Sequence, residues 1–312
     1  MKNKVLVTGG CGYLGSTLVP KLLDNGFAVT VIDNMMFGQS SLNQVCLNPN
    51  FNFIFGDIRD QDLIKSHCAN ADIIIPLAAY VGAPICAKDP TGAHTINNVA
   101  VKMMLSQLSS DQLVIMPTTN SAYGSGGDDN YCDEKSLLNP ISKYAVDKVE
   151  IENELMQRPL SISFRLATVF GMSPRMRLDL LVNDFTYRAL NDRFLVLFES
   201  HFKRNYIHVT DVAEAFLHGI RNASTMAGEI YNVGLSDANV SKWQLCQEIK
   251  KHLPEFYFVE ADVGADPDQR NYLVSNAKIE ATGFKPRVSL SAGISELIKG
   301  LKMINNRKHG NV

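Results

Sequence analysis

The glycine-rich stretch at residues 8–15, TGGCGYLG, constrains the fold of this chain more than any other feature. It follows a short apolar segment, residues 4–8, and precedes residues 14–24, where apolar side chains recur at helical spacing. Another apolar segment follows at 28–32. The glycines permit a tight turn and let the backbone approach a pyrophosphate at the amino end of a helix. The stretch therefore predicts a strand–turn–helix–strand unit that binds a nucleotide.

An aspartate, Asp33, ends the second of these strands, 18 residues after Gly15. An acid at this place can hydrogen-bond both hydroxyls of a ribose and would repel a 2′-phosphate. Asp33 and the glycines together predict a dinucleotide, NAD rather than NADP. The alternative is a structural turn followed by a solvated aspartate, which the full strand–turn–helix context disfavours.

Segments of strand and helix character alternate along the first half of the chain. Further strands are expected at 51–55, 73–77, 113–117 and 161–165, and helices at 60–68, 95–108 and 142–156. This alternation predicts an α/β fold with a doubly wound parallel sheet of the Rossmann type. We expect a Rossmann domain over 1–168, to which 205–230 return, and a smaller C-terminal substrate-binding region over 169–204 and 231–312.

The composition excludes several classes of partner. The 312 residues include 30 Lys plus Arg and 32 Asp plus Glu, a net charge of −2, which gives no reason to expect nucleic acid or an anionic membrane. No apolar run approaches the roughly 18 residues that span a bilayer, and no signal peptide is evident. The six cysteines form no C-x-x-C pair and the histidines no ligand spacing. These features predict a cytoplasmic protein with reduced thiols and no metal site.

A tyrosine and a lysine in the segment 140–148, PISKYAVDK, have the spacing of a catalytic pair. Tyr144 and Lys148 stand four residues apart, so a helix places them on one face. A tyrosine with an ordinary pKa near 10 is a poor base at neutral pH, but a nearby ammonium favours the phenolate. Such a tyrosine can take a hydroxyl proton while the same carbon gives hydride to NAD⁺. Thr119 follows an apolar strand, where its hydroxyl would face the ligand crevice.

With these motifs on one chain, the sequence resembles the extended short-chain dehydrogenase/reductase family, specifically its nucleotide-sugar epimerases and dehydratases. The resemblance covers essentially the whole chain. It extends to GDI at 56–58, LAA at 77–79, NNV at 97–99, FRLATVFG at 164–171 and RNYIHVTD at 204–211. Thr119 aligns with the family's catalytic Ser or Thr, and Tyr144 and Lys148 with its catalytic Tyr and Lys.

The resemblance also implies two sets of ligand contacts. The expected NAD contacts are Gly9, Gly12, Tyr13, Leu14, Gly15, Asp33, Asn34, Asp57, Ile58, Leu77, Ala78, Ala79, Asn98, Tyr144 and Lys148. The expected contacts of a nucleotide-diphosphate sugar are Thr119, Asn120, Ser121, Thr168, Arg175, Arg177, Asn183, Arg204 and Arg270. Two alternatives stay open: the basic segment 173–177 could be a solvated loop, and Asn183 could lie on the surface of a helix.

Departures from the family pattern restrict the expected reaction. Family dehydratases carry Asp-Glu directly after the catalytic Thr, whereas this chain has Asn120 and Ser121, so 4,6-dehydration is disfavoured. Pro76 stands where the family usually has His, and Thr168 where it usually has Asn. The expected step is oxidation at C4 of the sugar, in which Tyr144 takes the O4 proton.

Three outcomes of this chemistry remain. The chain as a whole most resembles bacterial enzymes that oxidise C4 of GDP-D-glycero-D-manno-heptose in capsule polysaccharide pathways, which implies a GDP-sugar 4-dehydrogenase that releases the keto sugar. A 4-epimerase would instead return the hydride. A non-catalytic NAD-binding regulator is disfavoured because the set of Thr119, Tyr144 and Lys148 is intact.

The resemblance further implies a homodimer. Family members pair through two helices of the Rossmann domain, which correspond here to 95–108 and 142–156. Both segments carry apolar residues on more than one face, so each could need a second partner. The alternative is that both helices bury these residues against their own sheet.

Overall fold

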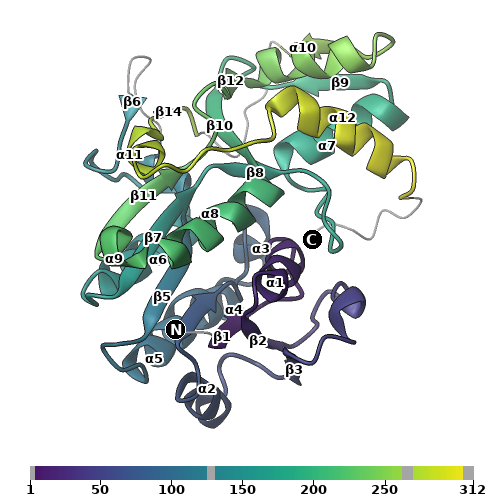
Figure 1. Cartoon of the computed structure of the whole chain (residues 1–312). Helices are drawn as coiled ribbons and strands as arrows, with labels where there is room; N and C mark the ends of the chain where they lie inside the picture. The colour runs from purple at the N-terminus through teal and green to yellow at the C-terminus, as the bar shows by residue number, and fades with distance from the viewer. Residues whose placement is uncertain (1–3, 125–130, 262–269, 305–312) are drawn as a thin grey trace.

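A computed structural model of the chain describes residues 4–124, 131–261 and 270–304. Its largest unit is a parallel sheet of seven strands in the order β11-β7-β5-β4-β1-β2-β3 (Figure 1). The strands are β1 (Lys4–Thr8), β2 (Ala28–Asp33), β3 (Phe51–Phe55), β4 (Ile73–Pro76), β5 (Leu113–Thr119), β7 (Ser161–Leu166) and β11 (Glu229–Val233). The order reverses between β1 and β4, which confirms the predicted doubly wound α/β fold.

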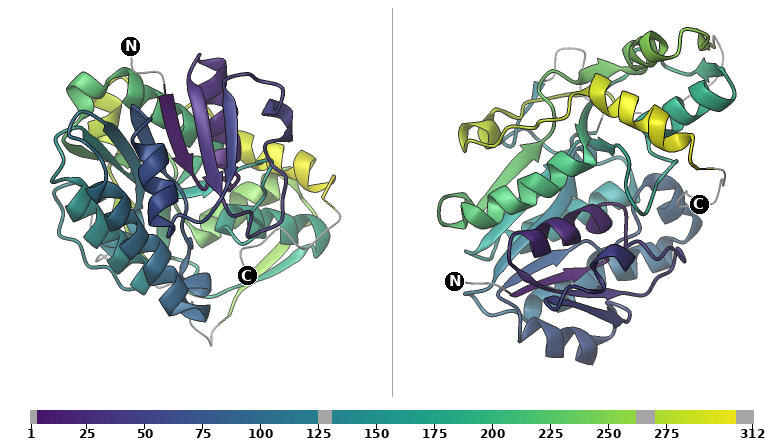
Figure 2. Two further views of the ribbon diagram at one scale, coloured as in Figure 1. Left: turned by 90° about the horizontal axis from the view of Figure 1, so that it is seen from below. Right: turned by 45° about the vertical axis from the view of Figure 1, so that its right-hand side comes forward.

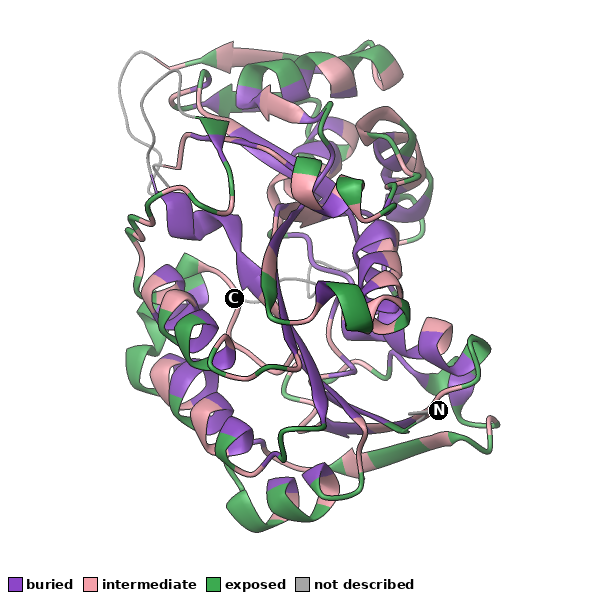
Figure 3. Ribbon diagram, turned by 60° about the vertical axis from the view of Figure 1, so that its left-hand side comes forward, coloured by how far each residue is buried: buried purple, intermediate pink, exposed green. Residues whose placement is uncertain are grey.

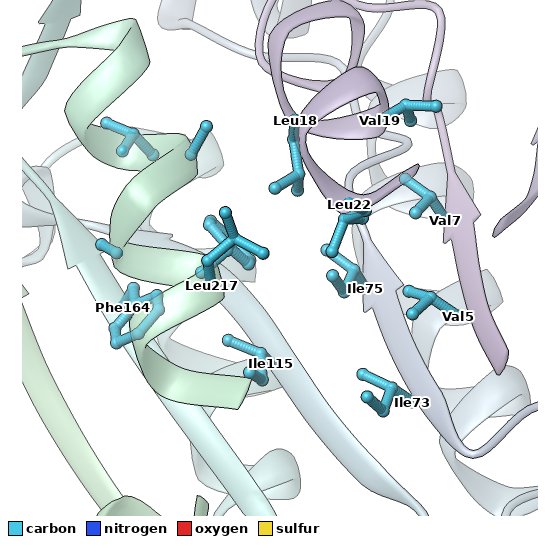
Figure 4. Packing of buried hydrophobic residues seen from close by; sticks show 14 of the residues in the cluster. Val5, Val7, Leu18, Val19, Leu22, Ile73, Ile75, Ile115, Phe164 and Leu217 are labelled. Atoms are coloured by element: carbon cyan, nitrogen blue, oxygen red, sulfur yellow. The ribbon is translucent and has the colours of Figure 1, made fainter. Parts of the chain in front are cut away.

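Helices cover both faces of this sheet. On one face, α1 (Gly15–Asp24) and α8 (Val209–Arg221) pack apolar side chains such as Leu18 and Leu217 against Ile75 and Phe164 (Figure 4). On the other face lie α2 (Gln61–Cys68), α5 (Ala100–Ser106) and α6 (Lys143–Leu155). Figure 3 shows the central strands almost wholly buried between helices whose outer faces are exposed. Burial on both faces explains why these strands read as continuous apolar runs.

The helix predicted over 95–108 differs from the observed one. The chain turns helical earlier, in α4 (Pro90–His94), because Asp89 caps it by accepting a hydrogen bond from the Gly92 amide. It then passes through a π-helical turn, η2 (Thr95–Val99), before α5. Such turns insert one extra residue and re-aim the side chains around them.

The C-terminal part of the chain lies beside the large sheet (Figure 2) and contains a second apolar core. One small sheet contains β8 (Thr168–Phe170), β10 (Lys203–His208) and β12 (Asn239–Ser241), and a second contains β9 (Phe194–Leu197) and β13 (Tyr257–Glu260). Three helices pack with them: α7 (Leu181–Asn191), α10 (Lys242–His252) and α12 (Leu290–Leu301). The division into the two predicted domains stays a prediction, although β11 joins the large sheet from within this later part of the chain.

Short elements complete the described chain. They are η1 (Asn43–Val45), α3 (Ala83–Lys88), η3 (Asn120–Tyr123), β6 (Tyr131–Cys132), α9 (Ala223–Met226), β14 (Leu273–Val274) and α11 (Ala277–Ala281). The strands β6 and β14 pair with each other in parallel. Within the described ranges, each helix is too short or too polar to cross a lipid bilayer.

Candidate active site

A cleft opens at the carboxyl ends of the parallel strands, near the point where the strand order reverses between β1 and β4. This is where ligands bind in open α/β sheets. Its lining comes from the β1–α1 turn, the ends of β2 and β3, the segments after β4 and β5, one face of α6, the segment 166–180 and Arg270. The cleft therefore gathers residues that lie far apart in the sequence.

The predicted glycine turn forms one wall of the cleft. Gly9 has a φ of +70°, and a side chain there would place its Cβ 2.5 Å from the amide nitrogen of Ala78. A Cβ at Gly15 would lie 2.5 Å from the carbonyl oxygen of Gly10. Only glycine fits at either place, so the turn can hold α1 with its amino end toward the cleft.

The carboxylate of Asp33 is fixed at the end of β2. Its Oδ2 accepts a hydrogen bond from the amide of Cys11 (2.9 Å), and its Oδ1 accepts one from the amide of Met35 (2.8 Å). Burial raises the pKa of this carboxyl above its ordinary value, while the two amides oppose the rise. Each oxygen keeps a further lone pair, so the group can still accept from two ribose hydroxyls.

The other residues expected near an adenosine lie on the same side as Asp33. Asn34 donates to the carboxylate of Asp57 (3.3 Å), and the guanidinium of Arg59 lowers the pKa of Asp57 to about 2. These expected NAD contacts all line the cleft: Gly9, Gly12, Tyr13, Leu14, Gly15, Asp33, Asn34, Asp57, Ile58, Leu77, Ala78, Ala79, Tyr144 and Lys148.

The catalytic pair lies on α6, whose amino end Ser142 caps by accepting from the Ala145 amide. The Nζ of Lys148 donates to the carbonyl oxygen of Pro117 (3.4 Å), two residues before Thr119. Burial lowers the pKa of Lys148 to about 8 and raises that of Tyr144 to about 12. The sequence predicted that Lys148 would lower the tyrosine pKa.

In the structure, two arginines rather than Lys148 lower the pKa of Tyr144. The positive charges of Arg177 and Arg270 oppose the rise at Tyr144, and burial outweighs both. The phenol of the unliganded protein is therefore protonated at neutral pH. Positive charge brought close to Tyr144 would move it toward the phenolate.

Thr119 is held in a hydrogen-bonded chain that ends at Arg270. Its Oγ1 donates to the Oγ of Ser121 (3.0 Å) and accepts from the Ser121 amide (3.0 Å). The same Ser121 hydroxyl accepts from Nη1 of Arg270. An arginine from the C-terminal part of the chain is thus one hydroxyl away from the predicted catalytic threonine.

A buried ion pair beneath the cleft joins α6 to the sheet. The guanidinium of Arg165 on β7 donates to Oε1 of Glu152 on α6 (2.6 Å), and both side chains are almost inaccessible. Glu152 also accepts from the hydroxyls of Thr118 and Ser163 (2.8 and 2.7 Å). This network fixes the helix that carries Tyr144 relative to the strand that carries Thr119.

The arginines of the segment 173–177 both line the cleft, so the alternative of a solvated loop is wrong. Arg175 and Arg177 are only 2 % and 7 % exposed. Arg177 donates to the carbonyl oxygen of Val81 (3.2 Å) and pairs with Asp179 (2.5 Å). The other expected substrate contacts that line the cleft are Thr119, Ser121, Thr168 and Arg270.

Four predicted ligand contacts do not line the cleft. Arg204 is buried on β10, and Asn120 is buried directly after Thr119. Asn98 donates instead to Oε2 of Glu150 (2.7 Å) on α6. The reason lies in the π-helical turn: it is the preceding Asn97 that bonds to both the amide and the carbonyl of Tyr80 (2.8 and 2.9 Å) in the segment after β4.

Asn183, the fourth, is fully buried, which also excludes the alternative of a helix-surface residue. Its Oδ1 accepts from the amide of Gly171 (3.0 Å), and its Nδ2 donates to the carbonyl of Arg177 (2.8 Å) and the hydroxyl of Tyr13 (3.3 Å). The side chain shapes the segment that carries the arginines and is not free to hold a ligand.

Other residues of the cleft were missed by the sequence analysis. The segment after Asp33, residues 35–39, and the segment 80–82 line it. Met35 adopts a φ of +54°, uncommon for a side chain of its size, so the backbone turns sharply after the aspartate. The residue types of this segment, MMFGQ, do not indicate ligand binding. Only the position of the segment directly after β2 could have predicted that it lines the cleft. The described residues include no cluster of three or more His, Cys, Asp or Glu suited to a metal ion.

Comparisons with known proteins agree with this geometry. The model of the NAD dependent epimerase/dehydratase family matches residues 5–234. A putative UDP-glucose 4-epimerase of Methanocaldococcus jannaschii is 27 % identical over 97 % of this chain and 99 % of its own length. The dTDP-glucose 4,6-dehydratase of Streptomyces niveus is 26 % identical over 95 % of this chain and 92 % of its own.

Among solved structures, the UDP-glucose 4-epimerase of Thermotoga maritima with UDP-glucose superposes with a TM-score of 0.83. It is 25 % identical, and the match covers 96 % of this chain and 99 % of that one. The whole described architecture, including the C-terminal region, therefore has a counterpart in a known fold.

Proposed function

The chain belongs to the NAD dependent epimerase/dehydratase family, and we propose that it oxidises the C4 hydroxyl of a nucleotide-diphosphate sugar. NAD⁺, when bound, supplies the hydride acceptor. Tyr144 in its phenolate form takes the O4 proton as the C4–H bond breaks and the C=O bond forms. Thr119 orients the hydroxyl, and Lys148 holds the nicotinamide ribose. Arg177 and Arg270 bind the sugar nucleotide and add positive charge that favours the phenolate.

The observation that carries this proposal is the placement of carboxylates in the cleft. Removal of water from a 4-keto sugar needs an acid and a base beside the sugar. Among the described lining residues, the only carboxylates are Asp33 and Asp57, both on the cofactor side. Asn120 and Ser121 follow the catalytic threonine instead. The arrangement supports oxidation at C4 without dehydration.

Two finer assignments follow from this step. Whole-chain resemblance favours a 4-dehydrogenase that acts on a GDP-manno-heptose and releases the 4-keto sugar. The relatives named as UDP-glucose 4-epimerases favour the second candidate, a 4-epimerase that returns the hydride to the other face of C4. Both use the same residues, and they differ only in whether the keto sugar leaves.

The test is a substrate screen. Purified protein with bound NAD is incubated with GDP-, UDP-, dTDP- and CDP-sugars, the absorbance of reduced nicotinamide is followed, and products are identified by mass spectrometry and sugar analysis. A loss of two hydrogens identifies a dehydrogenase, an unchanged mass with an inverted C4 an epimerase, and a loss of water contradicts the proposal. No reaction in any arm would favour the non-catalytic regulator.

We also propose a homodimer formed through α5 and α6. Val99, the last residue of η2, is half exposed, and Met103 on α5 is partly buried, so an apolar face remains there. Met104 and Leu155, in contrast, are buried against their own sheet. Light scattering at micromolar concentration should give twice the chain mass for the unmodified protein and the single-chain mass for Met103→Glu. A monomeric unmodified protein would contradict the proposal.

A further inference from the structure

Arg175 is a buried cation whose donors are incompletely used. Its side chain is 2 % exposed, and its Nε and Nη2 atoms have no hydrogen-bond partner among the described residues. The guanidinium carbon lies 3.9 Å from the centre of the Phe37 ring, which holds the group in place without satisfying its donors. Burial lowers the pKa of Arg175 to about 10, which reflects the cost of this position. An unpaired buried charge in a cleft indicates that a ligand supplies the counter-charge.

Hydrogen bonds hold the backbone around Arg175 against the glycine turn. Ser173 Oγ donates to the carbonyl of Tyr13 (2.7 Å) and shares a hydrogen bond with Ser16 Oγ (2.8 Å). The amide of Arg175 donates to the same Ser16 hydroxyl (3.3 Å), and Ser16 is the second residue of α1. The side chain therefore starts at the amino end of α1, where the helix and the glycine turn favour an anion.

The far end of the side chain lies toward the adenosine side of the cleft. Phe37 stands four residues after Asp33. The carboxylates of Asp179 and Asp33 both act electrostatically on Arg175, without hydrogen-bonding to its unpaired donors. Arg177, two residues on, hydrogen-bonds directly to Asp179 and lowers the pKa of Tyr144. The two arginines thus serve opposite ends of one cleft.

We infer that Arg175 binds the diphosphate of the NAD cofactor, and not the sugar nucleotide to which the sequence assigned it. The Arg175 side chain runs from the amino end of α1 to Phe37. In this fold the turn at that helix end receives a diphosphate, and the aspartate near Phe37 receives a ribose, so the side chain lies between the two. Cofactor binding would then also hold the segment 171–177 against the glycine turn. The inference concerns the NAD site and holds whether the enzyme is a dehydrogenase or an epimerase.

The experiment compares Arg175→Met with Arg177→Met in protein freed of nucleotide. Isothermal titration with NAD and ADP should show 10- to 100-fold weaker binding for Arg175→Met, because charge-assisted hydrogen bonds to a phosphate are lost. Adenosine, which has no phosphate, should bind both variants as it binds the wild type. Arg177→Met should bind NAD within about threefold of the wild type. If nucleotide cannot be removed, the molar ratio of NAD retained after gel filtration replaces the titration.

Two further measurements test whether weaker NAD binding by Arg175→Met comes from a disturbed fold instead. The melting temperature of nucleotide-free Arg175→Met should equal or exceed that of the wild type, because an unpaired buried charge is removed, while the rise in melting temperature on adding NAD should shrink. Lower stability with unchanged NAD affinity would overturn the inference, as would a selective loss of sugar-nucleotide affinity. A loss confined to NADP would assign the arginine to a 2′-phosphate instead. Failure of the wild type to bind any dinucleotide would overturn the family cofactor site as well.

Discussion

At the cofactor end of the cleft, the side chains and amides come from adjacent turns of the chain: the glycine turn, the end of β2 and the end of β3. At the reaction end, Thr119, Tyr144, Arg177 and Arg270 come from four separate segments. The first end is held by backbone hydrogen bonds and by the absence of side chains at Gly9 and Gly15. The second is held by buried polar side chains.

This difference has an electrostatic consequence. At the cofactor end, two backbone amides stabilise the Asp33 carboxylate, and the site is formed before any ligand arrives. At the reaction end, burial leaves Tyr144 protonated and moves Lys148 toward neutrality, so the pair is not yet primed. The cofactor end therefore determines what binds, and the reaction end depends on charge that the ligands bring.

The largest expected effect lies at the reaction end. Tyr144→Phe removes only the hydroxyl that takes the O4 proton, so turnover should fall at least about 100-fold, while NAD affinity stays within about threefold. Steady-state rates and NAD titration measure the two quantities. Tyr257→Phe, at an exposed tyrosine on β13, is the control and should keep full activity. Activity near the wild-type level in Tyr144→Phe would place the base elsewhere.

A smaller effect is expected at the arginine that reaches Thr119 through Ser121. Arg270→Ala should raise KM for the sugar nucleotide about 10- to 100-fold, the equivalent of one lost charge-assisted contact of roughly 1.5–3 kcal/mol. NAD affinity should not change. Arg188→Ala, at an exposed arginine on α7, serves as the control.

Arg204 sharpens this test. The resemblance placed it on the substrate, whereas the structure buries it on β10 away from the cleft lining. We expect Arg204→Ala to raise KM less than Arg270→Ala does. An equal or larger rise in KM would show that Arg204 reaches the substrate after all.

The two ends also differ in how far the sequence predicts them. Six strands of the large sheet, the glycine turn and the start of α6 were predicted, because each rests on local patterning and on caps within a few residues. The strand β11, which joins the sheet from the later part of the chain, was not predicted. The pairing of Arg270 with Ser121 joins residues far apart in the sequence, and no local pattern encodes it. Tertiary packing likewise determines which ligand Arg175 and Arg177 each face, so the sequence alone does not predict it.

A single extra residue explains the clearest local failure. The π-helical turn η2 rotates the Asn97–Asn98 pair, so that Asn97 holds the segment after β4 and Asn98 bonds to α6. Neither the regular helix expected over 95–108 nor the resemblance that implied Asn98 anticipates such a turn. Neither Asn97 nor Asn98 lines the described cleft, so the NAD contact that the resemblance implies for Asn98 stays a prediction.

At the cofactor end, Asp33→Ala should weaken NAD binding about tenfold and reduce the preference for NAD over NADP. The first effect follows from lost ribose hydrogen bonds and the second from lost repulsion of a 2′-phosphate. Asp33→Asn keeps the size of the side chain but removes its charge and one of its two acceptor oxygens, so it should show both effects, with a smaller loss of NAD affinity than Asp33→Ala. The KM for the sugar nucleotide should stay unchanged in both variants. An unchanged ratio of NAD to NADP affinity would contradict the role of Asp33.

The smallest effect concerns Lys148, where the two ends meet. Its pKa is about 8 in the folded protein and near 10.5 when unfolded, so between these values the unfolded chain holds one more proton. The contribution of Lys148 to the free energy of unfolding must then rise with pH, by about 1 kcal/mol per pH unit above pH 8. Lys148→Met should lack this rise and be more stable than the wild type at pH 7, since no ammonium is buried.

Denaturant titrations of nucleotide-free protein between pH 7.5 and 9.5 measure this slope. This range ends below the fall in stability that Tyr144 causes between about pH 10 and 12. The buried cysteines, whose raised pKa makes stability fall as pH increases, contribute alike to both proteins. The difference in slope between the wild type and Lys148→Met therefore isolates the lysine. Lys143→Met, at a half-exposed lysine on the same helix, is the control and should keep the wild-type slope. Equal slopes in the wild type and Lys148→Met would show that the lysine is not desolvated, and the reaction end would then be as fully formed before ligand binding as the cofactor end.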